Sequence, residues 1–485
     1  MNAGQVAAVD LGATSGRVML ASVGPGVLEM HAVARFPNEP VHLWNGTRAA
    51  LHWDLPGLFG QVCRGLRSAV TQADALLGIG IDSWAVDYGM LRGGQLLGLP
   101  HHYRDVRTEA GVAAVHEIVS PDELFQRNGL QFLPFTTVYQ LAAERISGML
   151  DSADRALLIP DLVVYWLTGH AVAERTNAST TGLRDLGGAL DRDLCAQLGV
   201  PAHLFPDTVD PGTVLGPVLP EITDLLGLGS DVQVSAVASH DTASAVAAVP
   251  MDATAAAYIS CGTWGLVGVE VPRAVVSPEV QHARFTNEAG VDGRIRLLHN
   301  VMGLWLLSES VRTWERDDGP VDLPELLMQA AECPQPIALF DTDDPRFLPP
   351  GDVPDRIERW YTEHDLPVPP GRPHLVRAII DSLAASFSAA VHTAAALSGV
   401  DVRRIHLVGG GAQNTLLCQA IADRAGIAVL AGPVEATALG NALVQARAHG
   451  LVRGDLETLR ALVAGTYVPR TYTPRTRRRG SPALV

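Results

Sequence analysis

One short pattern occurs twice in the chain, about 250 residues apart, in residues 6–20 and 257–269. Each copy is an apolar run, a turn of glycine and small hydroxyl residues, and a second apolar run. This arrangement predicts a β-hairpin whose turn exposes backbone N–H groups. Successive N–H groups beside hydroxyls form a concavity that suits an anion such as phosphate. Two such turns in matching halves predict a duplicated fold that closes on a nucleotide.

The length and the charge balance limit the class of protein. A chain of 485 residues with 47% hydrophobic and 18% charged residues is expected to form at least two well-packed domains. The net charge of −16 argues against a surface for nucleic acid or for an acidic membrane. No apolar run reaches the roughly 20 residues that cross a bilayer, and no secretory leader is evident, so we expect a cytoplasmic enzyme.

The basic residues have an unusual composition. All 36 are arginines, because the chain contains no lysine. This excludes a Walker A lysine, the ATP-pairing lysine of protein kinases and any Schiff-base lysine. If the chain handles ATP, then backbone amides, hydroxyls, arginine and a metal must bind it. The five cysteines are scattered and form no CxxC, which supports neither a disulfide framework nor a zinc site.

Hydrophobic periodicity predicts alternating strands and helices along the chain. In the first half we expect a hairpin at 6–23, a helix at 55–75, a strand at 78–82, a hairpin at 86–101, helices at 120–127, 138–149 and 160–167, and a strand at 232–238 before a helix that starts at His240 or Asp241. In the second half we expect a hairpin at 256–271, a helix capped by Asn300, a long helix at 373–397, a strand at 404–408 and a helix at 414–425. Residues 334–373 contain many Pro and Asp residues and are expected to be a loop or lid.

Strands joined by helices in both halves indicate an α/β architecture with mixed sheets. The hairpin at the start of each half distinguishes it from a purely parallel dinucleotide-binding sheet. We predict an N-terminal domain at 1–248, a C-terminal domain at 249–470 and a basic, disordered tail at 471–485. Each domain would present its hairpin turn at an interdomain cleft, where ligand sites preferentially lie.

A histidine and a carboxylate lie at the predicted strand-to-helix junction in residues 238–243. Asp241 is either an ordinary helix cap or a general base that the helix N-terminus keeps ionised near a substrate hydroxyl. His240 is either a core histidine or a hydrogen-bond partner of the substrate. With Ser239 these residues cannot form a hydrolase triad, because sequence neighbours do not converge on one another. No G-x-S-x-G motif occurs either.

Three further segments have both a functional and a structural interpretation. The glycines at 409–411 allow a close approach of the backbone to phosphate, or they form a plain strand-to-helix turn. Asp82 and Asp87 flank Trp84, which suits a polyol, or they are solvated acids at a strand edge. Residues 103–105 form either a polar cluster in the cleft or a surface ion pair.

Asp10 lies on the first predicted hairpin, beside its phosphate turn. A carboxylate at that place repels phosphate unless a divalent cation lies between them. The functional interpretation therefore implies Mg²⁺, with Asp10 as a metal-binding residue. In a chain without lysine this cation is expected to be the main charge compensator.

Together these segments closely resemble the FGGY family of carbohydrate kinases, within the actin-like ATPase superfamily. The resemblance rests on residues 9–20, 80–87, 129–135, 176–181, 239–244, 262–264, 299–307 and 408–414, which follow one another in family order. It implies two duplicated actin-like (ribonuclease H-like) domains. Within the family the motifs are most similar to those of the members that act on L-rhamnulose. The implied reaction transfers the γ-phosphoryl group of ATP to the 1-hydroxyl of L-rhamnulose and gives L-rhamnulose 1-phosphate and ADP.

The resemblance also implies roles for single residues. Asp241 matches the catalytic base of the family, and His240 and Asn300 match sugar-binding positions. The positions that match ATP-binding segments are Ala13, Thr14, Ser15, Gly16 and Arg17 in the N-terminal phosphate loop, Thr263 in the second phosphate hairpin and Gly410 in the glycine turn. The chain departs from its relatives at two positions. Ala85 stands where a sugar-contacting glycine occurs, and Ser308 stands where the ATP-contacting residue can be a glutamine.

The expected partners are a ketose and ATP, in a monomer or a small homo-oligomer without nucleic acid or membrane. Ala85 leaves open a kinase for another ketose, such as L-fuculose or L-xylulose. A non-catalytic actin-like nucleotide switch is an alternative from a different class, although a carboxylate beside a histidine argues against it. A phosphatase or hydrolase on the same scaffold is a further alternative, which phosphate release without sugar would identify.

Overall fold

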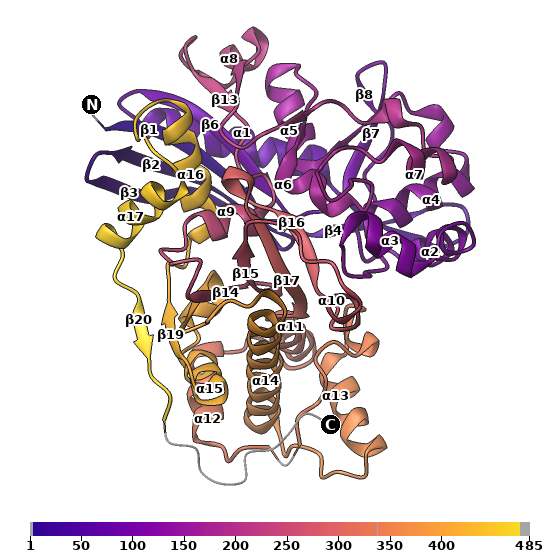
Figure 1. Ribbon diagram of the computed structural model, residues 1–485, viewed down its shortest axis with the longest axis vertical. Coiled ribbons are helices and arrows are strands. Elements are labelled where there is room, and N and C mark those ends of the chain that lie inside the picture. Colours follow the sequence, from indigo (N-terminus) through magenta and orange to yellow (C-terminus); the bar gives the residue numbers. More distant parts are fainter. Residues whose placement is uncertain (1–2, 337, 476–485) are drawn as a thin grey trace. The chain divides into compact units, whose positions relative to one another are not determined.

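The computed structural model describes residues 3–336 and 338–475 (Figure 1). The chain divides into two compact units that are interleaved in sequence. The first comprises Met1–Pro250, Val271–Arg296 and Ala436–Tyr467, and the second comprises Met251–Glu270, Leu297–Glu435 and Val468–Val485. The predicted domains at 1–248 and 249–470 stay a prediction. The tail predicted at 471–485 extends beyond Arg475, so most of that prediction lies outside the described residues.

The main sheet of the first unit has six strands in the order β12-β13-β6-β1-β2-β3. These are β1 (Gly4–Leu11), β2 (Ser15–Gly24), β3 (Val27–Pro37), β6 (Leu76–Ser83), β12 (Val214–Pro217) and β13 (Gln233–Ser235). As the repeated turn predicts, β1 and β2 form an antiparallel hairpin, and β6 pairs with β1 in parallel. β13 pairs with β6 in parallel, and β12 is antiparallel to β13. The carboxyl ends of β1, β6 and β13 therefore lie at one edge of this sheet.

Several helices pack on the sheet of the first unit. Asp54 accepts a hydrogen bond from the Gly57 amide at the start of α1 (Leu55–Gln72), and buried apolar residues recur in it at helical spacing, at Leu55, Leu58, Val62 and Leu66. α16 (Ala436–Ala448) contacts β1, β2 and β6, and α17 (Leu456–Thr466) contacts β3. Figure 1 shows this late part of the chain in yellow beside the indigo strands of the N-terminus. Residues from late in the chain therefore complete the core of the first unit.

The rest of the first unit consists of short strands and helices. Its other strands are β4 (Pro40–Trp44), β5 (Ala49–Trp53), β7 (Tyr88–Arg92), β8 (Gln95–Leu96), β9 (Arg155–Leu158), β10 (Ala173–Glu174), β11 (Thr208–Val209) and β16 (Thr286–Ala289). Its other α-helices are α2 (Thr108–His116), α3 (Pro121–Asn128), α4 (Thr137–Ser147), α5 (Ile159–Thr168), α6 (Arg175–Ala178), α7 (Arg192–Gln197), α8 (Pro220–Leu226), α9 (Asp241–Ala247) and α10 (Pro278–His282). The predicted helices in this region exist, with ends that differ by a few residues.

The sheet of the second unit contains consecutive strands in the order β17-β15-β14-β18-β19-β20. They are β14 (Ala256–Cys261), β15 (Trp264–Val271), β17 (Ile295–Met302), β18 (Arg404–Val408), β19 (Ala428–Ala431) and β20 (Arg470–Tyr472). β15 and β14 pair antiparallel, β14 pairs with β18 in parallel, β18 pairs with β19 in parallel, and β19 and β20 pair antiparallel. In the first unit the strands β2, β1, β6, β13 and β12 show the same order of antiparallel, parallel, parallel and antiparallel pairings. This repeat supports the predicted duplication, and the predicted α/β class with two main sheets is confirmed.

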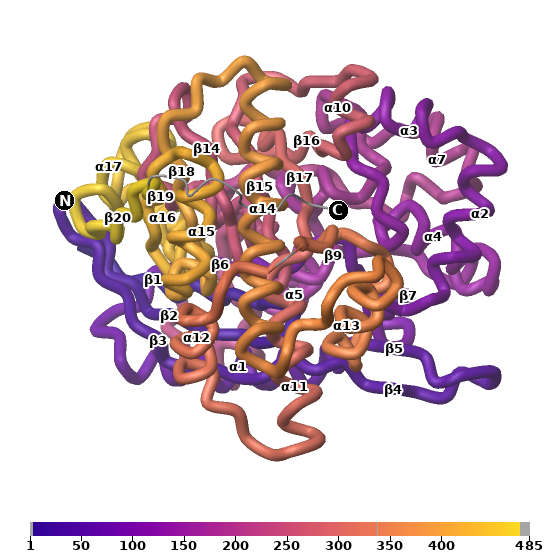
Figure 2. Tube along the Cα trace, turned by 90° about the horizontal axis from the view of Figure 1, so that it is seen from below, coloured from indigo at the N-terminus to yellow at the C-terminus, as the bar shows by residue number. Residues whose placement is uncertain are grey.

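The helices of the second unit include one long apolar helix. They are α11 (Trp305–Asp318), α12 (Leu323–Glu332), α13 (Val353–Glu363), α14 (Arg372–Ser398) and α15 (Thr415–Ala425). α12 and α15 both contact α14, and Figure 2 shows α15 beside it. By length and composition α14 alone among the described helices is able to span a membrane, but 78% of its apolar window is buried in the fold. Such burial is typical of the core helix of a globular domain.

Two expectations for the second half are wrong. Asn300 does not cap a helix, because it lies within β17, and α11 begins at Trp305 after Leu304. β17 is largely buried, so its apolar residues do not alternate and the strand pattern is hidden. The segment 334–373, expected to be a loop, contains α13. Pro354 occupies the first turn of α13, where a proline is compatible with a helix.

Candidate functional site

Two parallel strands and one loop bring three carboxylates together in the first unit. Asp10, near the end of β1, and Asp82, near the end of β6, are direct register partners. The amide of Ser83 donates a hydrogen bond of 2.9 Å to the carbonyl of Ser239, two residues before Asp241. The charges of Asp10 and Asp241 both act on Asp82. The sequence predicted Asp10 and Asp241 as site residues, and the fold places them in the same cluster.

The three carboxylates differ in their access to solvent. Asp10 is 2% exposed and Asp82 is fully buried, whereas the side chain of Asp241 is 32% exposed. Asp241 is the first residue of α9, as predicted, and its Oδ1 accepts a hydrogen bond of 3.1 Å from Thr242 Oγ1. Asp241 is therefore the member of the cluster that is open to a ligand.

His240 is held on both sides by charged groups. Its Nδ1 lies 3.1 Å from Nη2 of Arg296 and 3.3 Å from Oε2 of Glu288, and its Nε2 lies 3.4 Å from Oδ1 of Asp241. A guanidinium only donates, so Nδ1 accepts when it bonds to Arg296 and donates when it bonds to Glu288, and the two contacts correspond to different tautomers of the ring. His240 can therefore be a buried histidine and still lie beside a ligand, because its contacts with Arg296 and Glu288 orient the ring next to Asp241.

Glu288 and Arg296 form the buried base of this network. Oε2 of Glu288 lies 3.0 Å from Nη2 of Arg296, whose side chain has no exposed surface. Burial works to raise the pKa of Glu288, but the charge of Arg296 and the hydrogen bond with His240 outweigh it and hold the pKa below its ordinary value. Sequence reasoning missed both residues, because β16 and the start of β17 follow His240 by about 50 residues.

Glu174 fixes the loop that carries His240 and Asp241. Its Oε2 accepts hydrogen bonds from the Ser239 amide at 3.0 Å and from Ser239 Oγ at 2.7 Å. The same carboxylate accepts from Thr176 Oγ1 at 2.6 Å and caps α6. Burial raises the pKa of Glu174, against these hydrogen bonds. Residues 176–181, which follow Glu174, were identified as one of the segments that carry the family resemblance, whereas the acid that organises them was not.

A residue late in the chain, Asn441, binds Asp82. Its Oδ2 accepts a hydrogen bond of 2.5 Å from Asn441 Nδ2, which also lies 3.2 Å from the carbonyl of Gly80. Burial and the charge of Asp10 raise the pKa of Asp82 well above its ordinary value. Asn441 and Gln445 are polar residues four apart in the buried middle of the mostly apolar α16. This spacing is the sequence signal that would have pointed to a polar contact.

The predicted phosphate turn of the first unit is a closed loop with exposed hydroxyls. The amide of Gly12 donates to the carbonyl of Ser15 at 2.9 Å, and the side chain of Asn38 donates to the carbonyl of Gly12 at 2.8 Å. Thr14 and Ser15 are exposed, Ala13 is half-buried and Gly16 is buried. Arg17 Nε lies 2.8 Å from Oδ2 of Asp10. Part of the negative charge of Asp10 is therefore already compensated within the hairpin.

In the second unit two predicted ATP-binding segments adjoin each other. Thr263 lies in the β14–β15 turn, which a hydrogen bond of 2.8 Å from the Gly262 amide to the Trp264 carbonyl closes. A Cβ on Gly409 would lie 2.9 Å from the carbonyl oxygen of Cys261, and one on Gly411 would lie 2.4 Å from its Sγ. These two glycines are thus needed for packing on the end of β14. Gly410 is exposed, and a Cβ there would meet nothing within 4 Å.

The other predicted residues of the second unit lie on different elements. Ser308 is exposed on α11, one turn after the start of the helix. Asn300 is half-buried on β17. The described residues contain no group of three or more His, Cys, Asp or Glu side chains that could hold a metal ion.

The acids beside Trp84 have a structural role that neither sequence interpretation included. Asp87 is buried, and its carboxylate accepts hydrogen bonds from Trp53 Nε1 at 2.6 Å, Trp84 Nε1 at 3.0 Å and Gln140 Nε2 at 2.9 Å. Burial raises the pKa of Asp87 to about 6. The carboxylate therefore holds the indoles of Trp53 and Trp84, which contact each other at an interplanar angle of 37°, and is not free to bind a polyol. Ala85 is half-buried next to this cluster.

Asp105 is likewise part of the structure. It is buried, forms an ion pair with Arg48 and accepts a hydrogen bond of 2.8 Å from the Leu51 amide. Although burial opposes ionisation, the hydrogen bonds from Arg48 and from backbone amides lower the pKa of Asp105. Asp105 thus forms an ion pair, as one of the two interpretations of residues 103–105 expected, but its carboxylate is buried and the pair ties down the β4–β5 hairpin.

The chain matches two family models over nearly its whole length. Residues 5–248 match the N-terminal domain of the FGGY family of carbohydrate kinases, and residues 257–449 match its C-terminal domain. The sequence is 41% identical over 476 residues to a rhamnulokinase of Pectobacterium atrosepticum, covering 97% of this chain and 93% of the relative. It is 40% identical over 473 residues to a rhamnulokinase of Yersinia pestis, covering 96% and 94%.

Solved structures of similar fold extend over the same length. A xylulose kinase from Lactobacillus acidophilus matches with a TM-score of 0.78 and 17% identity, over 97% of this chain and 94% of the other. A glycerol kinase from Plasmodium falciparum, solved with ADP, matches with a TM-score of 0.74 and 15% identity, over 98% and 94%. At these identities the match establishes the fold.

Proposed function

Because the chain belongs to the FGGY family of carbohydrate kinases, we propose that it phosphorylates L-rhamnulose at the 1-hydroxyl at the expense of ATP. A carbohydrate kinase takes a sugar and ATP as substrates. The choice of sugar is supported by 41% identity to a rhamnulokinase over almost the whole chain. The products are then L-rhamnulose 1-phosphate and ADP.

The accessibility of Asp241 is the observation that carries the proposed mechanism. It is the exposed member of a cluster whose other two carboxylates are buried. Asp241 accepts the proton of the sugar hydroxyl as that oxygen attacks the γ-phosphorus, and the β–γ bridging oxygen leaves on ADP. His240, fixed by Glu288 and Arg296, orients the hydroxyl or the carboxylate. Asn300 and Ala85 contact the sugar.

ATP binding is assigned to the two hairpin turns and the glycine turn. Residues 13–17, Thr263, Ser308 and Gly410 contact the nucleotide through backbone amides and hydroxyls. The open space at Gly410 supports this role, because the packing of its neighbours does not need that glycine. In a chain without lysine, positioning and electrostatic stabilisation by such groups replace a P-loop.

The donor set near Asp10 fits Mg²⁺ as a cofactor. Carboxylate oxygen is a ligand that Mg²⁺ prefers, and this ion usually keeps several waters and phosphate oxygens rather than an all-protein cage. When bound, the ion would neutralise charge on the phosphates. Arg17, paired with Asp10, limits the repulsion between this carboxylate and ATP.

The experiment that tests this function is ADP release measured against a panel of ketoses. We expect the highest kcat/KM with L-rhamnulose and lower values with L-fuculose and L-xylulose. An Ala85→Gly variant, which removes one methyl group, serves to probe specificity, and the exposed Asp224→Asn on α8 serves as a matched surface control. Release of ADP that no ketose stimulates would refute the kinase assignment. A preference for another ketose would refute only the sugar.

A further inference from the structure

The first unit contains a cavity of about 730 Å³ that is separate from the carboxylate cluster. Asn287 and Ala289 of β16 line it. Glu288, the residue between them, contacts His240 instead. Successive side chains of a strand point to opposite faces, so the cavity and the carboxylate cluster lie on opposite sides of β16. The volume lies within the range typical of small-molecule sites.

The charged lining of this cavity favours an anion. Four arginines and three aspartates line it, namely Arg175, Arg184, Arg273, Arg294, Asp185, Asp210 and Asp292. All three aspartates are already engaged. Asp210 pairs with Arg175, Asp292 lies 2.9 Å from Nη1 of Arg447, and Asp185 accepts 2.9 Å hydrogen bonds from two amides of its own turn. The ion pairs of Asp210 and Asp292 therefore go to Arg175 and Arg447, and neither goes to Arg184 or Arg273.

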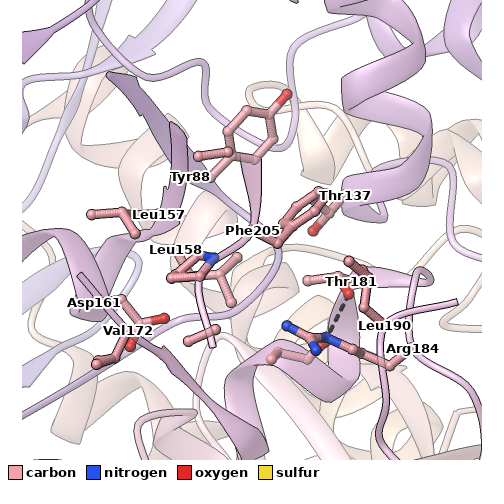
Figure 3. Close-up of a pocket in the computed structure, with 14 residues that line it drawn as sticks. Tyr88, Thr137, Leu157, Leu158, Asp161, Val172, Thr181, Arg184, Leu190 and Phe205 are labelled. Atoms are coloured by element: carbon pink, nitrogen blue, oxygen red, sulfur yellow. Dashed lines mark hydrogen bonds between the residues drawn. The ribbon is translucent and has the colours of Figure 1, made fainter. Parts of the chain in front are cut away.

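Two of the arginines, Arg184 and Arg273, form no ion pair within 4.0 Å of a carboxylate among the described residues. Arg184 is 8% exposed, and the hydrogen bond that it donates goes to Thr208 Oγ1 at 2.9 Å. It also borders a small, mostly apolar pocket, where Figure 3 shows its guanidinium beside Thr181 and Leu190. Burial lowers the pKa of Arg184, although the charges of Asp161 and Asp185 act against this effect. Arg273 is exposed, at the wall of the large cavity.

The rest of the lining suits a sugar. It combines the polar residues Asn128, Ser179 and Asn287 with apolar surface from Leu186, Pro211 and Ile295. A sugar ring has hydroxyls at its edge and C–H groups on its faces, so a mixed wall matches it better than a purely charged or purely apolar wall does. Arginine is the side chain best suited to bind phosphate through paired N–H groups.

We propose that this cavity binds a sugar phosphate, with the phosphate group against Arg184 and Arg273 and the sugar against the mixed wall. The product of the reaction proposed above belongs to the same chemical class. The test must therefore distinguish this cavity from the carboxylate cluster.

Arginine footprinting provides that distinction and needs no catalytic turnover. The full-length protein is treated with phenylglyoxal, with and without fructose 1-phosphate, ribose 5-phosphate or inorganic phosphate, and labelled peptides are quantified by mass spectrometry. We expect the sugar phosphates to slow labelling of Arg273 at least fivefold. Arg17 reports on the carboxylate cluster, and the exposed Arg92 in β7 is the matched control that should not change. Protection of Arg273 does not depend on whether the protein phosphorylates a ketose. The sugar-phosphate proposal can therefore be wrong while the proposed function is right, and the reverse.

Binding of the sugar phosphates to variants gives the second measurement. By isothermal titration calorimetry, Arg273→Ala should raise the Kd for the protecting sugar phosphate at least tenfold, and Arg92→Ala should leave it within twofold. Three results would overturn the proposal: no protection of Arg273, an unchanged Kd in Arg273→Ala, or equal protection by inorganic phosphate alone. The last result would mean that the cavity binds anions without recognising a sugar.

Discussion

At the scale of single residues, the proposed proton acceptor of the carboxylate cluster is the exposed Asp241, whereas Asp10 and Asp82 are buried. Replacing Asp241 by Asn keeps the size of the side chain and removes the proton acceptor. We expect kcat to fall by about 10²–10⁴-fold, the range typical of general acid–base catalysis, while the Kd for ATP stays nearly unchanged. Steady-state kinetics and nucleotide titration measure the two quantities. Turnover near that of the unmodified protein would remove Asp241 from its proposed role.

The residues that the sequence identified and those that it missed differ in a physical way. Asp10, His240 and Asp241 stand in short motifs where a polar residue follows an apolar run, so the local pattern singled them out as candidates but left a functional and a structural interpretation open. Glu174 and Asn441 act on that cluster through contacts that join positions up to 359 residues apart. Local pattern carries no information about such pairs. The carboxylates of Asp82 and Asp87 were noticed, but their buried partners, and hence their structural roles, were not evident.

At the scale of elements, the contact between α9 and α16 is the most sensitive to added volume. A Cβ on Gly440 of α16 would lie 1.8 Å from the carbonyl oxygen of Ser244 in α9, so one of the two helices must move. We expect Gly440→Ala to lower the free energy of unfolding by about 1–3 kcal/mol and to lower kcat, because α9 begins with Asp241. Urea unfolding and kinetics measure both effects.

Gly465 on α17 provides a control in the same unit. A Cβ at this exposed helical position meets nothing within 4 Å. Alanine has the higher helix propensity, so Gly465→Ala should leave stability unchanged or raise it by up to about 1 kcal/mol. Equal destabilisation by both substitutions would contradict the packing explanation.

The elements also show what periodicity can and cannot predict. Both hairpins were predicted because their glycine turns interrupt two apolar runs. β17 was taken for the approach to a helix, since a largely buried strand has no polar face to give a period of two. α13 was taken for a loop because prolines were counted without regard to position, although Pro354 lies in the first turn. The repeated strand order was not predicted, since it depends on pairings between distant segments.

At the scale of the whole molecule, the interleaving of the two units predicts how truncation acts. A chain that ends at Glu435 lacks α16 and α17 and loses the partners of Asp82 and of the sheet around β1. We expect it to be inactive and to lack a cooperative thermal transition for the first unit. A chain that ends at Arg475 retains every described element and should keep its activity. Differential scanning calorimetry and the ADP-release assay compare the two; an active shorter chain would contradict the dependence on α16.

The same interleaving has a consequence during synthesis on the ribosome. After Pro250 has been added, 185 further residues, Met251–Glu435, must be translated before α16 begins. At about 5–20 residues per second this takes roughly 10–40 s. Over that time the apolar face of the sheet that α16 covers has no native cover from the same chain. We therefore expect chaperones to bind preferentially to nascent chains that are stalled between Met251 and Glu435.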